Sequence, residues 1–296
     1  MKILYCGLRG GFGNQLFQAA QALALSHRYG AEFVVDDGWY LGRRQSFEMP
    51  REFGLDSLML SYRLPNRYER SMLYFIDAGL KIQKRARLRL LPIHFDELPL
   101  SDSRLRRANR VFMHGSWQVF GAIVSLKSQL DGVFRFRRGT FGPAHSRCIA
   151  EISADSASVA VHVRRGDYVR NPRTAALHTA CSLEYYFQAL SLVRHRLHNP
   201  SIYLFSDDLE WARQNLPLTG MRVTVVDASK HESPERVHLA EFDLMRRCRH
   251  AVIANSSFSW WVAFLLQTPQ SLIIAPKQWY AWGSPSELYS PDWVLL

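Results

Sequence analysis

Two adjacent arginines, Arg164 and Arg165, follow an apolar run over residues 159–163 and precede a glycine and an aspartate. A short run rich in β-branched residues predicts a buried strand. Two successive guanidinium groups suit a diphosphate, because each presents a planar fork of N–H donors to phosphate oxygens. Open α/β sheets bind ligands beyond the carboxyl ends of their strands. The turn therefore predicts an enzyme that handles a phosphorylated, nucleotide-linked substrate.

Residues 10–15 form a glycine-rich turn between an expected strand and an expected helix, and the turn ends in Asn14 and Gln15. Glycines let the backbone approach a ligand closely, and a helix N-terminus favours an anion. The turn is not a dinucleotide fingerprint, because Leu16 stands where the third glycine would be, and no P-loop lysine follows. A turn that serves packing alone is the alternative, although it leaves the two amide side chains without a function.

Two further polar clusters follow expected strands. Asp207 and Asp208 come after an apolar run at 202–205, and such carboxylates suit either ribose and guanine donors or the cap of the next helix. Residues 255–259 hold an asparagine and three serines in front of an apolar helix. Helix capping competes there with a phosphate cradle of hydroxyls and backbone N–H groups, but one cap needs fewer polar groups. The two tryptophans that follow are expected in the core.

The usual ligands for a metal-bound sugar nucleotide are missing, because the chain contains no Asp-x-Asp motif. Glu241 and Asp243 come closest to that spacing, but they fall on an expected helix rather than at the end of a strand.

The surrounding sequence alternates between strand and helix patterns. A strand at 3–7, a helix at 15–29 and a strand at 32–35 start a Rossmann-like unit. Later segments are expected as short helices at 41–110, a strand and loop at 111–119, and an inter-domain crossing at 131–158. A second set follows, with strands at 159–163, 202–205, 223–226, 251–254 and 271–275 and helices at 183–195, 209–216, 239–248 and 259–266. This alternation predicts a parallel sheet covered on both faces.

Composition narrows the class of protein. The 296 residues are 47% hydrophobic, which suffices for one large or two ordinary domains, and the formal charge of +11 favours anionic partners. The first apolar run is too short for a signal peptide, and no stretch of about 18 apolar residues predicts a spanning helix. Four widely spaced cysteines are expected as free thiols of a reducing compartment. We therefore expect a cytoplasmic protein.

Residues 81–91 mix five basic residues with aliphatic ones. This pattern fits either a helix that lies on anionic lipid at the inner membrane face or an ordinary solvated helix face.

In their order along the chain, these segments resemble the α-1,2-fucosyltransferase family, and its bacterial members in particular. The residues that carry the resemblance are 11–18, 162–168, 205–208, 243–248 with His250, and 255–261, with weaker matches at 115–118, 181–186, Pro276 and Trp279. The resemblance spans nearly the whole chain and is poorest over 41–110.

This resemblance implies a GT-B-like α/β fold, with two Rossmann-type domains and a nucleotide-sugar cleft between them. Residues 1–145 would form the acceptor-side domain, and 146–296 the domain that binds GDP-fucose. The implied reaction is inverting transfer of L-fucose from GDP-β-L-fucose to the 2-hydroxyl of a terminal β-galactose, without a metal or other cofactor. The implied partners are GDP-fucose and a β-galactoside oligosaccharide, for which lipid-linked precursors are a fitting class. Nucleic acid is not an expected partner.

Carried over to this sequence, the family pattern assigns roles to individual residues. Arg164 and Arg165 would meet the negative charge that grows on the leaving β-phosphate. The other residues implied to bind substrate are Gly11, Gly13, Asn14, Gln15, His162, Asp207, Asp208, Asn255, Ser256, Ser257, Phe258 and Ser259. Of these, Asn14 would face the reacting sugar, while His162 and the two aspartates would hold guanosine.

The base that takes the acceptor's proton stays open. Asp167 suits either that role or the role of a counter-ion that orients one of the arginines. A strongly dissociative transition state would need no strong base.

Two other functions compete with this one. The first strand, glycine turn and helix, with Asp36 and Asp37 after the second strand, also fit a dinucleotide-dependent oxidoreductase, apart from the missing third glycine. The charge of +11 would fit a basic nucleic-acid-binding protein, but the arginines are spread along an α/β pattern and no binding module is recognisable.

Overall fold

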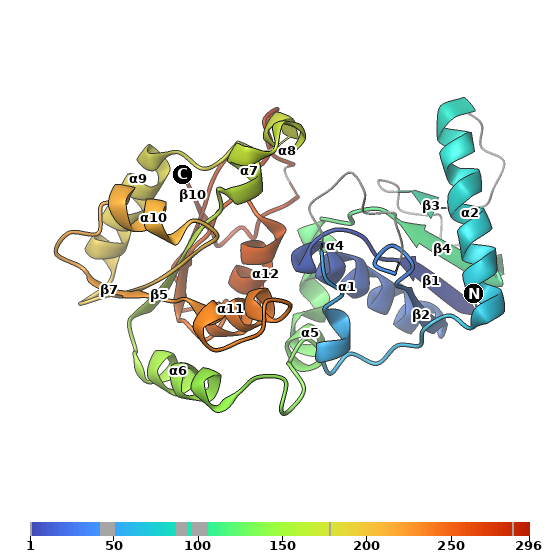
Figure 1. Cartoon of the computed structure of the whole chain (residues 1–296), viewed down its shortest axis with the longest axis horizontal. Helices are drawn as coiled ribbons and strands as arrows, with labels where there is room; N and C mark the ends of the chain where they lie inside the picture. Colours follow the sequence, from blue (N-terminus) through green and yellow to red (C-terminus); the bar gives the residue numbers. More distant parts are fainter. Residues whose placement is uncertain (1, 42–50, 87–93, 96–105, 178, 286) are drawn as a thin grey trace. The chain divides into compact units, whose positions relative to one another are not determined.

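The chain forms two compact α/β units, Met1–Arg135 and Phe136–Leu296 (Figure 1). The computed structural model describes residues 2–41, 51–86, 94–95, 106–177, 179–285 and 287–296. The boundary expected after residue 145 falls inside helix α6 (Pro143–Ala154), ten residues beyond the point where the two units divide.

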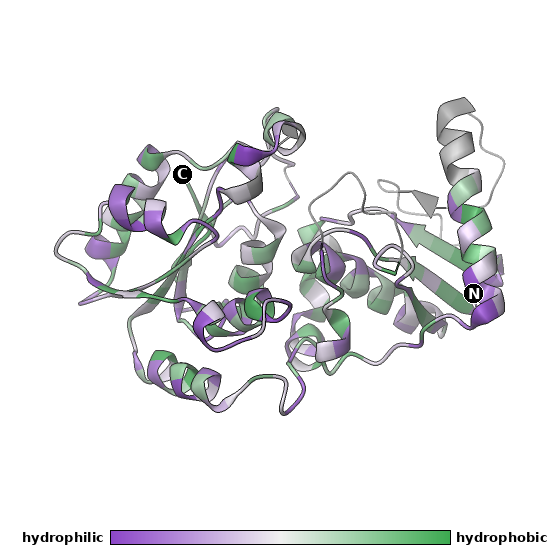
Figure 2. Ribbon diagram, in the orientation of Figure 1, coloured by the Kyte–Doolittle hydropathy of each residue, from purple (hydrophilic) through white to green (hydrophobic). Residues whose placement is uncertain are grey.

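The first unit is built on a parallel sheet with the strand order β2-β1-β4-β3. Its strands are β1 (Ile3–Gly7), β2 (Glu32–Asp36), β3 (His94–Phe95) and β4 (Arg110–His114). Helix α1 (Phe12–Tyr29) joins β1 to β2 and buries an apolar face that includes Leu16, Phe17 and Leu23. Strands β1 and β4 are coloured as hydrophobic in Figure 2, as expected for central strands of a parallel sheet. The predicted strand–helix–strand start is confirmed.

Helix α2 (Arg67–Ala86) is a single long helix where short irregular helices were expected. Two ion pairs connect this helix to residues that follow strands β2 and β1. Arg70 Nη1 lies 2.6 Å from Asp37 Oδ1, and Asp77 Oδ1 lies 2.5 Å from Arg9 Nη2. The sequence nevertheless carries a local signal for this helix, because Asn66 and Glu69 form a capping box at its start: Asn66 Oδ1 accepts the Glu69 N–H, and Glu69 Oε2 accepts the Asn66 N–H.

The second unit is built on a parallel sheet with the strand order β10-β9-β8-β5-β6-β7. Its strands are β5 (Ser158–Val163), β6 (Ser201–Ser206), β7 (Arg222–Val225), β8 (His250–Val252), β9 (Ile273–Ala275) and β10 (Val294–Leu295). The sheet does not end at β9, as the sequence suggested, because β10 pairs with it. Two residues at the chain terminus are too short a run to show a strand pattern.

Helices cover both faces of this sheet. The main ones are α9 (Leu183–Arg196), α10 (Leu209–Asn215), α11 (Val237–Met245) and α12 (Ser257–Leu266). Side chains of α9 and α10 pack on β5 and β6 in one core cluster, and α11 and α12 lie on the other side (Figure 1). Trp260 and Trp261 are fully buried, as expected.

The segment expected as an inter-domain crossing contains helix α6. Its glycine, proline and serine residues suggested a loop, but Pro143 stands in the first turn, where its missing N–H costs no hydrogen bond. The four cysteines are free, as expected.

Candidate active site

The two arginines and the two aspartates lie beside one another because their strands end together. Strands β5 and β6 are parallel neighbours whose last residues, Val163 and Ser206, are in register. The residues after them therefore emerge at the same edge of the sheet, where open α/β sheets bind ligands. The structure brings together the two motifs that the sequence could only place separately.

Asp207 organises the arginine turn. Its Oδ2 lies 3.0 Å from Arg164 Nη1, and its carboxylate accepts the backbone N–H groups of Arg165 at 2.9 Å and Gly166 at 3.0 Å. A Cβ on Gly166 would lie 2.6 Å from Asp207 Oδ2, so the close approach requires glycine. Asp207 thus holds the turn in shape from the neighbouring strand.

Arg165 is held by its own set of contacts. Its guanidinium lies 3.6 Å from the centre of the Trp211 ring, and its Nε lies 3.6 Å from Asp208 Oδ2. That Nε is buried and has no hydrogen-bond partner among the described residues. Asp208 also caps α10 by accepting the Trp211 N–H at 3.3 Å. Helix capping, one of the two interpretations of this carboxylate, is therefore confirmed for Asp208, and its role in binding guanosine stays a prediction.

His162 lies on β5, just before the arginines, and is buried. Burial lowers the pKa of its imidazole to about 4; Arg164 also lowers it, while Asp207 opposes the shift. The ring is thus neutral at pH 7, and its centre lies 5.7 Å from that of Phe258. Its Nδ1 has no hydrogen-bond partner among the described residues. A buried neutral imidazole with an unpaired nitrogen suits a polar ligand group.

The segment before α12 divides into two kinds of residue. Ser256 is the N-cap residue and Ser257 the first residue of the helix, and both are partly exposed at the end that favours anions. Asn255 and Ser259 are instead buried and hydrogen-bonded to the protein backbone. The phosphate cradle stays a prediction, and within this segment Ser256 and Ser257 are the serines whose exposure fits it.

Replacing Asn255 by alanine is expected to lower the free energy of unfolding by about 3 kcal/mol. Its amide nitrogen donates to the carbonyl oxygens of Thr179 (2.9 Å) and Trp279 (3.0 Å), which would lose that donor. Urea unfolding measures the change. A loss below about 0.5 kcal/mol would contradict the anchoring role, and Ser229→Ala, at an exposed hydroxyl that bonds within its own turn, serves as the control.

The glycine-rich turn of the first unit leads into helix α1. Gly11 is the N-cap residue of α1, and Gly13 is buried in its first turn. Asn14 is partly exposed, and its Oδ1 accepts the amide of Gln118 at 3.0 Å. Gln15 is buried; it donates to the carbonyl of Glu52 at 2.8 Å and accepts the N–H of Gly54 at 3.0 Å.

Two sequence predictions fall partly outside the described residues. Asp167 lies in the first turn of α7 (Gly166–Arg170), and its side chain is not among those described. The basic segment 81–91 continues α2 to residue 86, and its side chains are likewise outside the described part.

Glu241 is a titratable residue that the sequence analysis did not assign to the site. It lies half-buried on α11, and its pKa is raised to about 8, mainly by burial and further by the charges of Asp227 and Asp207; Arg164 acts in the opposite direction. Its carboxyl is therefore within electrostatic influence of two residues that form the arginine turn. The available signal was a lone glutamate in a helix whose neighbours Ala240 and Phe242 are buried.

The ionisation of Glu241 predicts a pH-dependent stability. Between the ordinary glutamate pKa of 4.5 and the raised pKa of about 8, the folded chain keeps the proton that the unfolded chain has released. The free energy of unfolding therefore falls as pH rises through this window. Glu241→Gln is expected to gain stability relative to the original protein from about pH 5 to 8, by at most about 1.4 kcal/mol per pH unit.

Urea titrations of both proteins at a series of pH values measure this difference. The pKa of His162 is lowered in the folded chain, so its contribution to the free energy of unfolding is lost as pH falls from 6.5 towards 4. This pH dependence has the opposite sign to that of Glu241. The histidine is present in both proteins, so its contribution cancels in the comparison. A difference independent of pH would show that Glu241 is ionised in the folded state.

Among the described residues, no group of three or more His, Cys, Asp or Glu side chains is arranged to hold a metal ion. No helix in the described part of the chain has the length and apolar character needed to cross a membrane.

The family model and three relatives that match this chain are all described as glycosyltransferases. Residues 111–296 match the family model described as glycosyl transferase family 11. The O-antigen biosynthesis glycosyltransferase WbnK of Escherichia coli is 26% identical over 99% of this chain and 100% of its own length. An α-1,2-colitosyltransferase of Escherichia coli is 28% identical over 95% of this chain and 93% of its own. The galactoside 2-α-L-fucosyltransferase SEC1 of Bos taurus is 37% identical over 48% of this chain and 39% of its own.

A solved structure supports the fold. The fucosyltransferase NodZ from Bradyrhizobium superposes with a TM-score of 0.50 and 15% identity, covering 89% of this chain and 91% of that one. With two Rossmann-type units in one chain, this likeness confirms the GT-B class that the sequence resemblance implied.

Proposed function

This chain belongs to glycosyl transferase family 11, and we propose that it transfers L-fucose from GDP-β-L-fucose to the 2-hydroxyl of a terminal β-galactose with inversion. The colitosyltransferase supports the α-1,2 linkage by its name, and SEC1 supports the galactoside acceptor and the fucose. WbnK supports an oligosaccharide of the O-antigen type as the acceptor, in keeping with a lipid-linked precursor.

The observation that carries the proposal is the rigid turn of Arg164 and Arg165 beside the N-terminus of α12. When the bond from the sugar to the diphosphate breaks, negative charge grows on the β-phosphate, and preorganised donors stabilise that charge. Asp207 holds the Arg164 guanidinium and the backbone of the turn, and Trp211 and Asp208 hold the Arg165 guanidinium, so both groups would need little reorganisation when the substrate binds. Ser256 and Ser257 would add hydroxyl and backbone donors. No step in this scheme requires a metal ion.

Guanosine recognition would fall to His162, Asp207, Asp208 and Glu241. The guanine edge presents two neighbouring donors, N1–H and the exocyclic amine, and one carboxylate can accept both. Both oxygens of Asp207 are already bonded to Arg164 and the turn. Glu241 would accept the two guanine donors after it releases the proton that its raised pKa of about 8 retains near neutral pH. A comparison of GDP with inosine diphosphate, which lacks the exocyclic amine, tests this role, because Glu241→Gln should abolish the preference for GDP.

Asp167 is proposed as either the base or an orienting residue, and Asp167→Asn separates the two roles. Loss of a base would remove most turnover, by about 100-fold or more, whereas loss of an orienting charge would spare most of it.

Transfer from GDP-fucose to lactose in the presence of EDTA tests the function as a whole. An α-1,2-linked product supports the donor, the linkage and the metal independence together. Protection by GDP-fucose against thermal unfolding without transfer would keep the donor and reject lactose as acceptor. The absence of both would contradict the proposed function.

Colitose is a second candidate for the transferred sugar, because the colitosyltransferase matches nearly the whole chain. Competition between GDP-fucose and GDP-colitose, scored by kcat/KM for one acceptor, decides between them.

A further inference from the structure

A hollow in the first unit has no part in the function described so far. Three of the residues that line it stand in one row across neighbouring strands, with Asp36 paired in register to Gly7 and Gly7 paired to His114. These residues end β2, β1 and β4, and the hollow therefore opens at the carboxyl edge of the sheet. The chain leaves β1 towards β2 on one side and later returns as β4 on the other. Such a switch in strand order is where open α/β sheets bind ligands.

Gly7, at the centre of this row, leaves the space of the hollow open because it has no side chain. A side chain at Gly7 would point to the same face as its register partners, and its Cβ would lie 3.3 Å from the imidazole Cδ2 of His114. The hollow measures about 430 Å³ including its open mouth, and the centres of water-sized groups can occupy about 30 Å³ of it. This space has room for one or two such groups. A ligand would therefore place a hydroxyl inside and its ring at the mouth.

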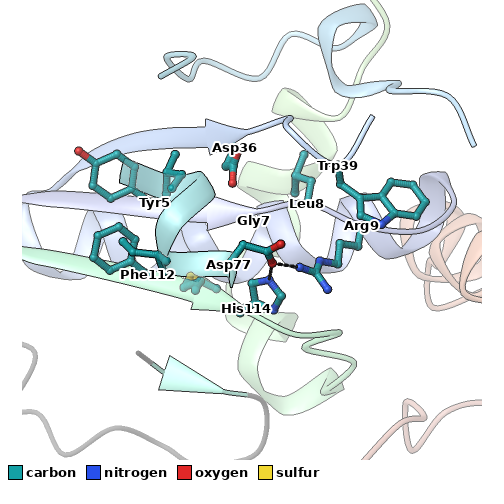
Figure 3. A pocket seen from close by; sticks show the side chains of 12 residues that line it. Tyr5, Gly7, Leu8, Arg9, Asp36, Trp39, Asp77, Phe112 and His114 are labelled. Carbon is teal, nitrogen blue, oxygen red and sulfur yellow. Dashed lines mark hydrogen bonds and ion pairs between the residues drawn. The ribbon is translucent and has the colours of Figure 1, made fainter. Parts of the chain in front are cut away.

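Three side chains from different elements meet over this space (Figure 3). Asp77, from α2, lies between Arg9 and His114; its Oδ1 is 2.5 Å from Arg9 Nη2 and 3.6 Å from His114 Nε2. Asp77 is buried, while Arg9 and His114 are partly exposed. Carboxylate, guanidinium and imidazole together offer acceptors and donors within one small volume.

The walls and the charge of the hollow select a neutral, hydroxyl-bearing ligand. Tyr5 and Phe112 stack with ring centres 5.0 Å apart, and the Trp39 side chain lines the hollow near the Arg9 end in Figure 3. A small number of polar groups on apolar walls is typical of small-molecule sites. Asp36 and Asp77 place two carboxylates beside the one guanidinium of Arg9, and this arrangement disfavours a diphosphate. A sugar ring, with an apolar face and a hydroxyl edge, fits both features.

From this geometry we propose that the Arg9–Asp77–His114 hollow is the subsite for the terminal β-galactose of the acceptor. The inference rests on the proposed function, which requires a galactoside acceptor. Asp77 accepts from a sugar hydroxyl, Arg9 donates to one, and Asp77 positions the His114 ring. The subsite binds and orients the acceptor, and the first unit thereby determines which sugar is used.

Lactose is the probe for this subsite. Asp77→Asn and His114→Gln are each expected to raise the KM for lactose by about tenfold or more, because each removes a hydrogen-bonding partner. The KM for GDP-fucose is expected to stay within about twofold. Saturation-transfer NMR of lactose with the GDP-bound protein should weaken in both variants.

Arg70→Gln is the matched control. It removes the other ion pair between α2 and the sheet side of the unit, at 2.6 Å, and Arg70 does not line the hollow. Both KM values should be unchanged in this variant. Loss of both GDP protection and lactose binding in these variants would overturn the subsite, because it would show that Asp77 and His114 support the fold rather than the acceptor.

The outcomes separate the subsite from the function. Transfer with an unchanged lactose KM in both variants overturns the subsite and leaves the function intact. Suppose that the original protein contacts lactose but transfers nothing from GDP-fucose, and that Asp77→Asn abolishes the contact. This result supports the subsite and contradicts the function. A protein that GDP-fucose protects but that shows neither lactose contact nor transfer overturns the galactoside subsite.

Discussion

Replacement of both Arg164 and Arg165 by alanine is expected to lower kcat by about 100-fold or more. The two guanidinium groups are fixed positive charges at the carboxyl ends of β5 and β6, where we place the diphosphate. Loss of a single preorganised donor to a developing oxyanion typically costs about 100- to 1,000-fold in turnover. Single-turnover rates of transfer from GDP-fucose measure the effect on the chemical step.

Arg165→Lys sharpens this prediction, because it keeps the positive charge and removes the planar fork. It should retain more activity than alanine and still fall well below the original enzyme. Arg222→Ala is the matched control: this exposed arginine begins β7 at the opposite end of the strands and donates to the Asn199 carbonyl. Full turnover in the double arginine variant would contradict the mechanism.

Gly166→Ala is expected to abolish detectable GDP binding while the second unit stays folded. The added Cβ would lie 2.6 Å from Asp207 Oδ2 and 3.1 Å from its Cγ. Asp207 cannot retreat without losing contacts to Arg164 and to the N–H groups of the turn. Overpacking of this kind typically costs about 1–3 kcal/mol, and here that cost falls on the geometry of the arginine turn. GDP-induced thermal shifts measure the loss of binding.

Gly142→Ala is the control for this substitution. Gly142 precedes α6 with a φ of −79° and a ψ of 176°, an extended backbone that alanine also adopts. Among the described residues, no atom lies within 4 Å of an added Cβ. The GDP affinity of this variant should be unchanged. Normal GDP protection in Gly166→Ala would show that the turn tolerates displacement of Asp207.

Local pattern predicted most of the second unit. The β5, α9, β6 and α10 segments combine buried apolar runs, capping residues and alternating strand and helix periods, and each was placed within a few residues of its observed bounds. Helix α2 was missed although Asn66 and Glu69 form a capping box at its start, and α6 was missed because its glycine, proline and serine content resembles that of a loop. The α12 start was placed at Ser259, although the helix begins at Ser257.

The chain's sequence alone determined the parallel α/β class, the arginine turn and the family resemblance, because these depend on residue type and spacing along a short segment. Only the tertiary structure decided which polar residues meet. It showed that Asp207 holds the arginine turn and that Gln15 and Asn255 bond to backbone groups. The physical reason is that pairing across a parallel sheet depends on strand order and register, which join segments distant in the chain.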